Sequence, residues 1–398
     1  ILRLKFKMGL FDNPYVKVKK AEKLIGTSGH REVAREVACQ SVVLLKNENQ
    51  LLPLSKEVKR VAVIGPNADN VYNQLGDYTA PQAPGSVITV LEGIRQKLPG
   101  AEVRYVKGCA VRDTLDTSIG EACETAKNSD VVVVVLGGSS ARDFETDFLE
   151  TGAAVANERK VSDMESGEGF DRIGLSLMGK QVELLKALYA TGRPVVLVMV
   201  QGRPLELNWA AEHIPAILTT WYPGGEGGRA IADVLFGDYN PAGRLPLSYP
   251  RHVGQLPVYY NHKSAERHDY VEGTAAPLYP FGFGLSYTTF VYEGIDVRVE
   301  GDSVRVSVDV KNVGGRAGDE VVQLYLRDEQ ASVVTPFMAF QRVHLTSGES
   351  RRVEFVLTEE HLRVLDTSLN WRVEPGWFTV MIGASSQDIR QRTRFRID

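Results

Sequence analysis

Residues 60–68 read Arg60-Val61-Ala62-Val63-Ile64-Gly65-Pro66-Asn67-Ala68, a continuous apolar run that ends in Gly-Pro-Asn. An apolar run of this length without polar alternation is typical of a strand buried on both faces, and the Gly-Pro-Asn indicates a loop after it. Similar runs recur at 131–136, 195–200 and 216–219. We therefore expect a sheet whose strands are covered on both sides.

Helical spacing of apolar residues fills the stretches between these runs. The patterns lie at 118–127, 175–190 and 227–236, and a further one, at 31–45, comes before a first strand and is closed by Pro53. Strands that alternate with helices predict a mainly parallel sheet, an α/β sandwich domain. In such sheets the loops at the carboxyl ends of the strands form the binding edge. We expect the loops at 76–78, 137–140, 201–204 and 141–172 to meet there.

The pattern changes after about Phe290 to alternating apolar and polar residues. Short alternating runs lie at 304–310, 321–326, 351–357 and 377–382, separated by glycine-containing turns. This pattern predicts an all-β sandwich of about 100 residues. The stretch from Pro250 to Tyr287 shows no helical period and is interpreted as an irregular linker.

Composition excludes several classes of partner. The 398 residues hold 46 Lys and Arg against 50 Asp and Glu, a net charge of −4, so no basic excess favours nucleic acid. No apolar run approaches the roughly 20 residues of a membrane span. Three cysteines (Cys39, Cys109 and Cys123) lack ligand spacing and are expected to be free thiols. We expect no metal and no cofactor; the compartment is unknown, with the periplasm or secretion favoured.

The loop at 165–172 carries the candidate chemistry. It reads Glu165-Ser166-Gly167-Glu168-Gly169-Phe170-Asp171-Arg172. Two glycines let Glu168 project from the loop, and a carboxyl held beside Phe170, Glu165 and Asp171 could keep its proton and donate it to a glycosidic oxygen. The alternative is a solvated acidic loop that caps the next helix. The residues alone leave both interpretations open.

A second candidate is the aromatic pair Trp221-Tyr222, which precedes a glycine-rich turn. A Trp-Tyr pair at the edge of a site can stack on sugar rings, whereas the alternative is a packed strand end. Gly65-Pro66-Asn67 and Gly137-Gly138 lack the spacing of a phosphate-binding loop, so nucleotide binding is not expected.

Six motifs resemble the C-terminal two-thirds of bacterial family 3 glycoside hydrolases, the β-glucosidase and β-xylosidase family, and the resemblance runs over essentially the whole chain. They lie at 4–15, 41–47 with 51–54, 61–68, 166–172, 237–246 and 279–288. Each alone is a weak glycine-rich turn, but all six occur in the family's order.

The resemblance implies three segments. Residues 1–30 are expected to link to an N-terminal (β/α)8 barrel absent from this sequence, residues 31–286 to form the α/β sandwich domain, and residues 287–398 to form a fibronectin type III-like sandwich. In this family the barrel carries the aspartate nucleophile and most residues that hold the first sugar. The barrel, as a separate segment or chain, is thus an expected partner, and a homodimer is left open.

The resemblance also implies site residues. The family's acid/base is the Glu of a Gly-Glu-Gly segment in many members, which falls on Glu168, with Glu165 as the fallback. We expect Asp143, Phe170, Asp171 and Arg172 to contact substrate, and the loop at 143–150 to lie beside the site.

The implied function is that of a retaining, exo-acting β-glycosidase that hydrolyses non-reducing terminal β-glucosides or β-xylosides. Its partner would be a β-linked glucosyl or xylosyl oligosaccharide or glycoside. A non-catalytic carbohydrate-binding or interaction module from the same family is the alternative. An N-acetylglucosaminidase of the family is a second rival, but such enzymes often dispense with the sandwich domain.

Overall fold

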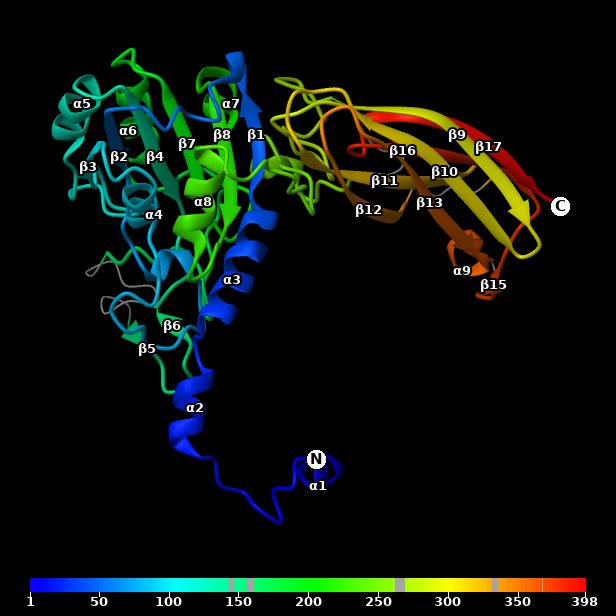
Figure 1. Ribbon diagram of the computed structural model, residues 1–398, viewed down its shortest axis with the longest axis horizontal. Helices are drawn as coiled ribbons and strands as arrows, with labels where there is room; N and C mark the ends of the chain where they lie inside the picture. Colours follow the sequence, from blue (N-terminus) through cyan, green and yellow to red (C-terminus); the bar gives the residue numbers. More distant parts are fainter. Residues whose placement is uncertain (143–146, 156–160, 262–268, 331–335, 367) are drawn as a thin grey trace.

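The computed structural model describes residues 1–142, 147–155, 161–261, 269–330, 336–366 and 368–398. Within these residues the chain forms an α/β domain, a β-sandwich and an extended N-terminal segment (Figure 1). The fold class expected from the sequence is confirmed. None of the described helices is both long and apolar enough to cross a membrane.

The α/β domain is built on a six-stranded sheet of order β1-β8-β7-β4-β2-β3. Its strands are β1 (Val43–Asn47), β2 (Arg60–Ile64), β3 (Glu102–Val106), β4 (Val131–Gly137), β7 (Val195–Val200) and β8 (Ala216–Trp221). Five strands run parallel, and β1 pairs antiparallel with β8 at one edge. The residues of β4 and β7 are all buried, as the continuous apolar runs predict.

Helices cover both faces of this sheet. One face packs against α5 (Ile119–Lys127), α6 (Gln181–Tyr189) and α7 (Asn208–His213), and the other against α4 (Val90–Lys97) and α8 (Gly227–Leu235). Short 3-10 turns lie at η1 (Glu48–Gln50), η2 (Tyr72–Gln74) and η3 (Val253–Gln255). Each face of the sheet has its own hydrophobic core with these helices. The two cores fix the position of the sheet, and with it the edge where the loops lie.

The expected helix at 31–45 is wrong at its end. Helix α3 (Ser28–Ser41) stops before Val42, and Leu45 lies in β1. Val33 and Val37, two of the apolar residues in the helical pattern, are 60% and 62% exposed. Ion pairs hold α3 on α8 instead, from Arg31 to Glu226 at 2.5 Å and from Arg35 to Asp233 at 2.6 Å. The expected helix at 175–190 also begins later than predicted, at Gln181.

The sandwich packs a three-stranded sheet, β13-β10-β9, on a four-stranded sheet, β12-β11-β16-β17. Its elements are β9 (Phe290–Glu300), β10 (Ser303–Asn312), β11 (Gly318–Asp328), β12 (Phe337–Leu345), β13 (Ser350–Thr358), α9 (Glu359–Leu362), β14 (Val364–Leu365), β15 (Trp371–Arg372), β16 (Gly376–Gly383) and β17 (Ile389–Ile397). Val304, Val306, Val308 and Val310 are each fully buried, which confirms the alternation seen in the sequence.

The two domains meet through polar contacts around a buried ion pair. Arg244 and Glu320 lie 2.7 Å apart with side chains 9% and 3% exposed, and Gln323 donates a hydrogen bond of 2.9 Å to the carbonyl of Gly282. Within the described part of the stretch at 250–287, Tyr279 lies in the α/β core, and the carbonyl of Gly282 accepts the hydrogen bond from Gln323 of the sandwich. The division at 286/287 stays a prediction.

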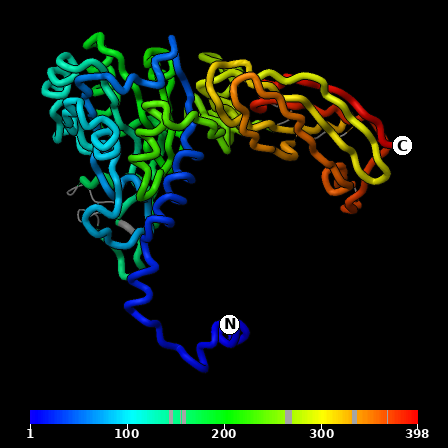
Figure 2. The backbone as a smooth tube through the Cα atoms, in the orientation of Figure 1, coloured from blue at the N-terminus to red at the C-terminus, as the bar shows by residue number. Residues whose placement is uncertain are grey.

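The N-terminal segment extends away from the sheet (Figure 2). Its helices α1 (Leu2–Lys7) and α2 (Val18–Leu24) have no buried residue. The role of residues 1–30 as a link to a barrel stays a prediction.

Candidate active site

The loops at the carboxyl ends of the parallel strands meet at one edge of the sheet, as expected. The side chain of Asn67, after β2, donates hydrogen bonds to the carbonyl of Gly138 at 3.1 Å and to that of Val200 at 3.2 Å. These contacts join the loops that follow β2, β4 and β7. The acidic loop at 165–172 belongs to the connection that follows β4.

A two-residue turn presents Glu168. The backbone N–H and carbonyl of Gly167 and Phe170 pair with each other, at 3.2 and 3.4 Å, so Glu168 and Gly169 form the tip. Gly169 has φ +97°, a conformation that side chains disfavour. Gly167 leaves room for its neighbour, because a Cβ there would lie 2.1 Å from the Cε of buried Met164, whose side chain would have to shift. Both glycines therefore serve the shape of the turn.

Glu168 lies in a polar cluster that its own loop does not supply. The side chain is 45% exposed. The hydroxyl of Tyr78, from the loop after β2, donates a hydrogen bond of 2.7 Å to Oε2, and this bond raises the pKa of Tyr78. Arg142 lies 4.0 Å from the same oxygen and 3.4 Å from Asp77. Glu168 is thus accessible and oriented from two sides.

The loop before this turn reaches Glu168 through Arg142. The guanidinium of Arg142 stacks on the ring of Phe148, in β5 (Asp147–Phe148), at 4.7 Å. This strand pairs with β6 (Ala154–Val155). The described part of the loop at 143–150 is thereby linked to the cluster around Glu168. Asp143 lies outside the described residues.

Glu165 occupies a different environment. Its side chain is 3% exposed and accepts a hydrogen bond of 2.5 Å from Arg172, whose side chain is 6% exposed. Burial raises the pKa of Glu165, while the charges of Arg172, Arg203 and Arg112 oppose the rise. Gly138 lies so close that a Cβ there would come within 1.9 Å of Oε1. Glu165 is held as a buried ion pair, out of reach of a ligand.

The two other candidate residues of this loop are Asp171 and Phe170. Asp171 is exposed and pairs with Arg203 at 2.7 Å. Desolvation acts in the opposite direction, but the N–H of Arg172 and the charge of Arg203 lower the pKa of Asp171. The sequence suggested two uncompensated negative charges beside Glu168, but arginines pair with both Glu165 and Asp171. Phe170 is half-buried and its backbone closes the turn.

Tyr222 is a packed strand end. Its partly buried ring lies against Gly76 and Gly202, where an added Cβ would lie 2.8 and 2.7 Å from ring atoms. Burial raises the pKa of this phenol, against a hydrogen bond with Ser140. Tyr222 therefore shapes the loop edge.

Sequence reasoning missed Arg142 and Arg112 as individual residues. Arg112 donates a hydrogen bond of 2.7 Å to the carbonyl of Met164 and so supports the acidic loop from a neighbouring strand connection. Neither arginine stands in a motif, so only the fold could bring them to this edge. Among the described residues, no cluster of three or more His, Cys, Asp or Glu has the arrangement of a metal site.

Comparison with known families identifies both domains. Residues 42–287 match the model of the glycosyl hydrolase family 3 C-terminal domain, and residues 320–386 match that of the fibronectin type III-like domain. The chain is 41% identical to a beta-xylosidase of Formosa agariphila, over 97% of this chain and 53% of the relative. It is 37% identical to a periplasmic beta-glucosidase of Salmonella typhimurium, over 98% of this chain and 54% of the relative.

Solved structures agree with this comparison. A mutant β-glucosidase from Listeria innocua, crystallised with laminaribiose, is 34% identical with a TM-score of 0.84, over 100% of this chain and 54% of that one. A β-glucosidase from intestinal bacteria involved in saponin metabolism is 32% identical with a TM-score of 0.88, over 100% of this chain and 58% of that one. The chain spans about half the length of the relatives it matches.

Proposed function

This chain belongs to glycoside hydrolase family 3, and on that premise we propose that it supplies the acid/base carboxyl of a retaining, exo-acting β-glycosidase. The substrates are β-glucosides or β-xylosides with a free non-reducing end, the classes that the names of its relatives indicate. The observation that carries the proposal is the turn at 167–170, which holds an accessible Glu168 at the sheet edge and against Tyr78.

The mechanism requires two carboxyl groups. The described residues form a sheet domain and a sandwich, so we assign the nucleophile to an aspartate of a barrel supplied by another segment or chain. That aspartate attacks the anomeric carbon while Glu168 gives its proton to the glycosidic oxygen, and the bond to the leaving group breaks. Water then loses a proton to Glu168 and displaces the aspartate from the anomeric carbon. Retaining enzymes of this kind hold the two carboxyls roughly 5 to 5.5 Å apart.

The contrast between the two glutamates favours Glu168. An acid/base must reach the glycosidic oxygen and gain and lose a proton in each cycle. Glu165 is buried and held by Arg172, whereas Glu168 is 45% exposed and its nearest hydrogen-bond partner is a single phenol. Glu165 then serves to fix the loop that carries Glu168.

Asp143, Phe170, Asp171 and Arg172 remain candidates for contact with substrate. The geometry supports Phe170 and Asp171 more than Arg172, because Arg172 is committed to Glu165 and to the carbonyl of Ser176. Arg142 joins the candidates through its position beside Glu168.

The proposal is tested by leaving-group dependence in the enzyme assembled with its barrel. Glu168→Ala should slow the hydrolysis of alkyl glycosides by about two to four powers of ten, the usual worth of a positioned acid/base group. Activated aryl glycosides need less protonation, so their first step should be slowed much less. Glu165→Ala serves as the matched control, and its loss of activity should be similar for both leaving groups. The reverse pattern would move the role to Glu165.

The alternative function is a non-catalytic carbohydrate-binding or interaction module of the same family. The chain alone should be inert on aryl β-glucosides and β-xylosides, and addition of a barrel chain should restore hydrolysis. Activity of the lone chain would refute a two-part site. An inactive chain that neither binds the barrel nor gains activity from it would favour the binding-module alternative.

A further inference from the structure

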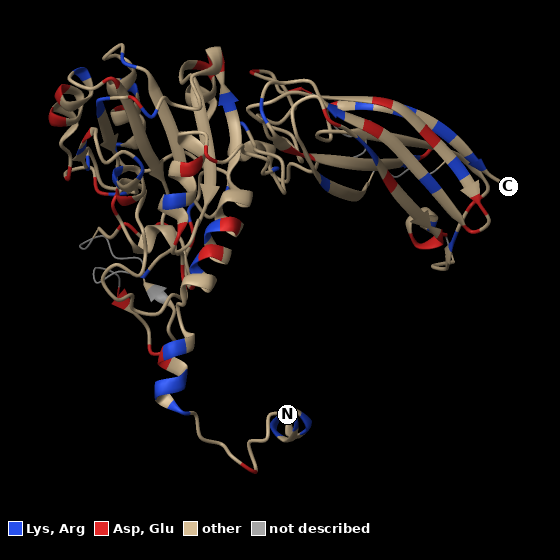
Figure 3. Ribbon diagram, in the orientation of Figure 1, with Lys and Arg blue, Asp and Glu red and all other residues tan. Residues whose placement is uncertain are grey.

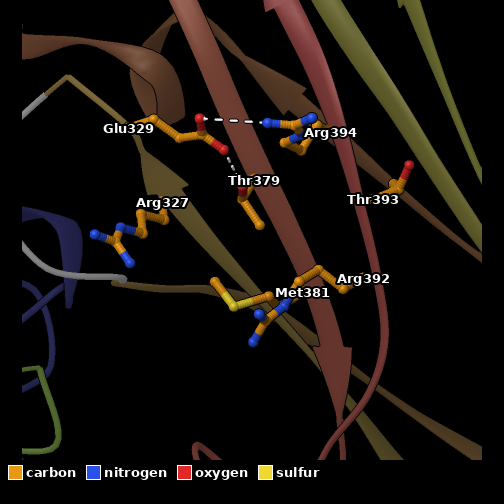
Figure 4. A pocket seen from close by; sticks show the side chains of 7 residues that line it. All are labelled: Arg327, Glu329, Thr379, Met381, Arg392, Thr393 and Arg394. Atoms are coloured by element: carbon orange, nitrogen blue, oxygen red, sulfur yellow. Dashed lines mark hydrogen bonds and ion pairs between the residues drawn. The ribbon is translucent and has the colours of Figure 1, made fainter.

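The outer face of the four-stranded sheet carries a hollow of about 900 Å3, far from Glu168 in the sequence (Figure 4). Its floor is formed by Thr379 and Met381 of β16, which are 9% and 7% exposed. Arg327 of β11 and Arg392 and Arg394 of β17 surround it. The hollow is therefore an apolar and hydroxyl floor framed by guanidinium groups.

Strand register places these side chains together. Thr379 pairs with Arg327 on one side and with Arg394 on the other, and Met381 pairs with Arg392. Directly paired residues of antiparallel strands point to the same face of a sheet. The alternate residues Leu326, Val380 and Phe395 are buried in the sandwich core, so the arginines point outward. Adjacent strands are about 4.8 Å apart, which puts Arg327 and Arg394 on opposite walls of one small site.

The positive charge of this site is only partly compensated. Arg394 lies 3.8 Å from Glu329, which also accepts a hydrogen bond of 2.6 Å from Thr379. Arg327 and Arg392 have no ion-pair or hydrogen-bond partner within the part of the chain that the structure describes. Figure 3 shows basic residues mixed with acidic ones over the rest of the sandwich, where most exposed arginines have a carboxylate partner. Two guanidinium groups without a counterion on one small face favour an anionic ligand.

Other features of the hollow favour a sugar acid over a phosphate polymer. Trp377 is 44% exposed at the next outward position of β16, and Arg394 lies 5.3 Å from the centre of its ring. An indole ring beside hydroxyl groups suits the face and hydroxyls of a pyranose. The carboxylate of Glu329 accepts hydrogen bonds from sugar hydroxyls but repels a continuous row of phosphates.

We propose that this hollow binds a carboxylate-bearing residue of a glycan, a uronic acid carried on an oligosaccharide chain. The carboxylate lies between Arg327 and Arg392, and the sugar ring lies over Met381 toward Trp377. The site would hold an acidic polysaccharide on the sandwich domain while another part of it is processed. Its occupancy does not depend on the role of Glu168.

Calorimetric titration of the 398-residue chain tests the site. The probe is a xylo-oligosaccharide that carries one glucuronic acid, compared with the same oligosaccharide without it. The double variant Arg327→Gln/Arg392→Gln should lower the affinity for the acidic probe about tenfold or more, the worth of one lost charge-assisted hydrogen bond or more. Arg298→Gln, an exposed arginine on β9 whose side chain is 70% exposed, should leave the affinity unchanged.

Further variants and control ligands in the same titration distinguish a glycan site from other binding sites. Trp377→Ala should lower affinity for the acidic probe, and circular dichroism should show that every variant keeps its fold. Equal affinity of the wild-type chain for the neutral oligosaccharide would overturn the carboxylate assignment. Equal or tighter binding of a short single-stranded oligonucleotide would identify a general polyanion surface and overturn the glycan assignment. Absence of binding to the acidic probe would overturn the site itself.

Discussion

Arg172→Met removes the cation that faces the buried carboxylate of Glu165. The side chains are 6% and 3% exposed and lie 2.5 Å apart. Loss of one partner from such a pair leaves an uncompensated buried charge, at a cost of about 3 to 5 kcal/mol. Because Arg203 and Arg112 also act on Glu165, we expect the lower end, about 3 kcal/mol. For a domain of this size that corresponds to a fall in Tm of about 6 to 12 °C.

The loss of folding stability caused by Arg172→Met should depend on pH in a defined direction. Burial raises the pKa of Glu165 above its ordinary 4.5, against the charge of Arg172. A raised pKa in the folded state contributes stability below the ordinary pKa, and this stability is lost as pH rises through the folded value. Without Arg172 the pKa rises further, so the loss extends to higher pH. The variant should approach the wild type in acid and differ most near neutral pH.

Urea unfolding across this pH range measures the effect. Arg60→Met is the matched control, because its pair with Asp130 at 3.1 Å has side chains 51% and 36% exposed and should stabilise the fold far less than a buried pair. Glu165→Gln in the Arg172→Met background should restore part of the stability. The reasoning is refuted if Arg172→Met costs no more than Arg60→Met, or if its deficit does not change with pH.

Three further changes follow from the geometry. Gly138→Ala would put a Cβ 1.9 Å from Oε1 of Glu165, and thermal unfolding should show a loss of about 1 to 3 kcal/mol; an unchanged Tm would mean that the carboxylate can move aside. Tyr78→Phe removes the 2.7 Å bond to Glu168, so kcat of the assembled enzyme should fall roughly two- to tenfold with little change in KM; an unchanged kcat would show that the phenol does not position Glu168. Arg244→Ala leaves Glu320 buried at the domain junction, and limited proteolysis should cut the stretch at 250–287 faster than in the wild type; equal rates would count against a junction held by this pair.

The sequence predicts the buried part of the fold best. β2, β4 and β7 appear as continuous apolar runs because both faces of these strands are covered. β3 was missed because this edge strand alternates exposed and half-buried residues over its first four positions, before the buried Val106, and shows no such run. The segment at 31–45 ends in the short apolar run 42–45, which fits either a helix or a strand. Pairing of Val43 with Thr219 makes it a strand.

The candidate site divides in the same way. Strands that alternate with helices are visible in local sequence patterns, and this alternation places the acidic loop at the carboxyl-end edge of the sheet. The partners of its carboxylates do not follow, because Tyr78 and Glu168 are 90 residues apart and meet only through the tertiary fold. The pairing of Glu165 with Arg172, seven residues away, could have been suspected from the sequence, but burial of both groups could not.

The most direct test of the account is the product that Glu168→Ala forms with azide in the enzyme assembled with its barrel. A small anion can enter the space left by the removed carboxyl and needs no general base. With an activated aryl β-glucoside or β-xyloside, azide should restore turnover and yield a glycosyl azide of β configuration. Glu165→Ala should yield none. A β-glycosyl azide from Glu165→Ala alone, or an α-configured product from Glu168→Ala, would contradict the assignment of Glu168 as the acid/base of a retaining enzyme.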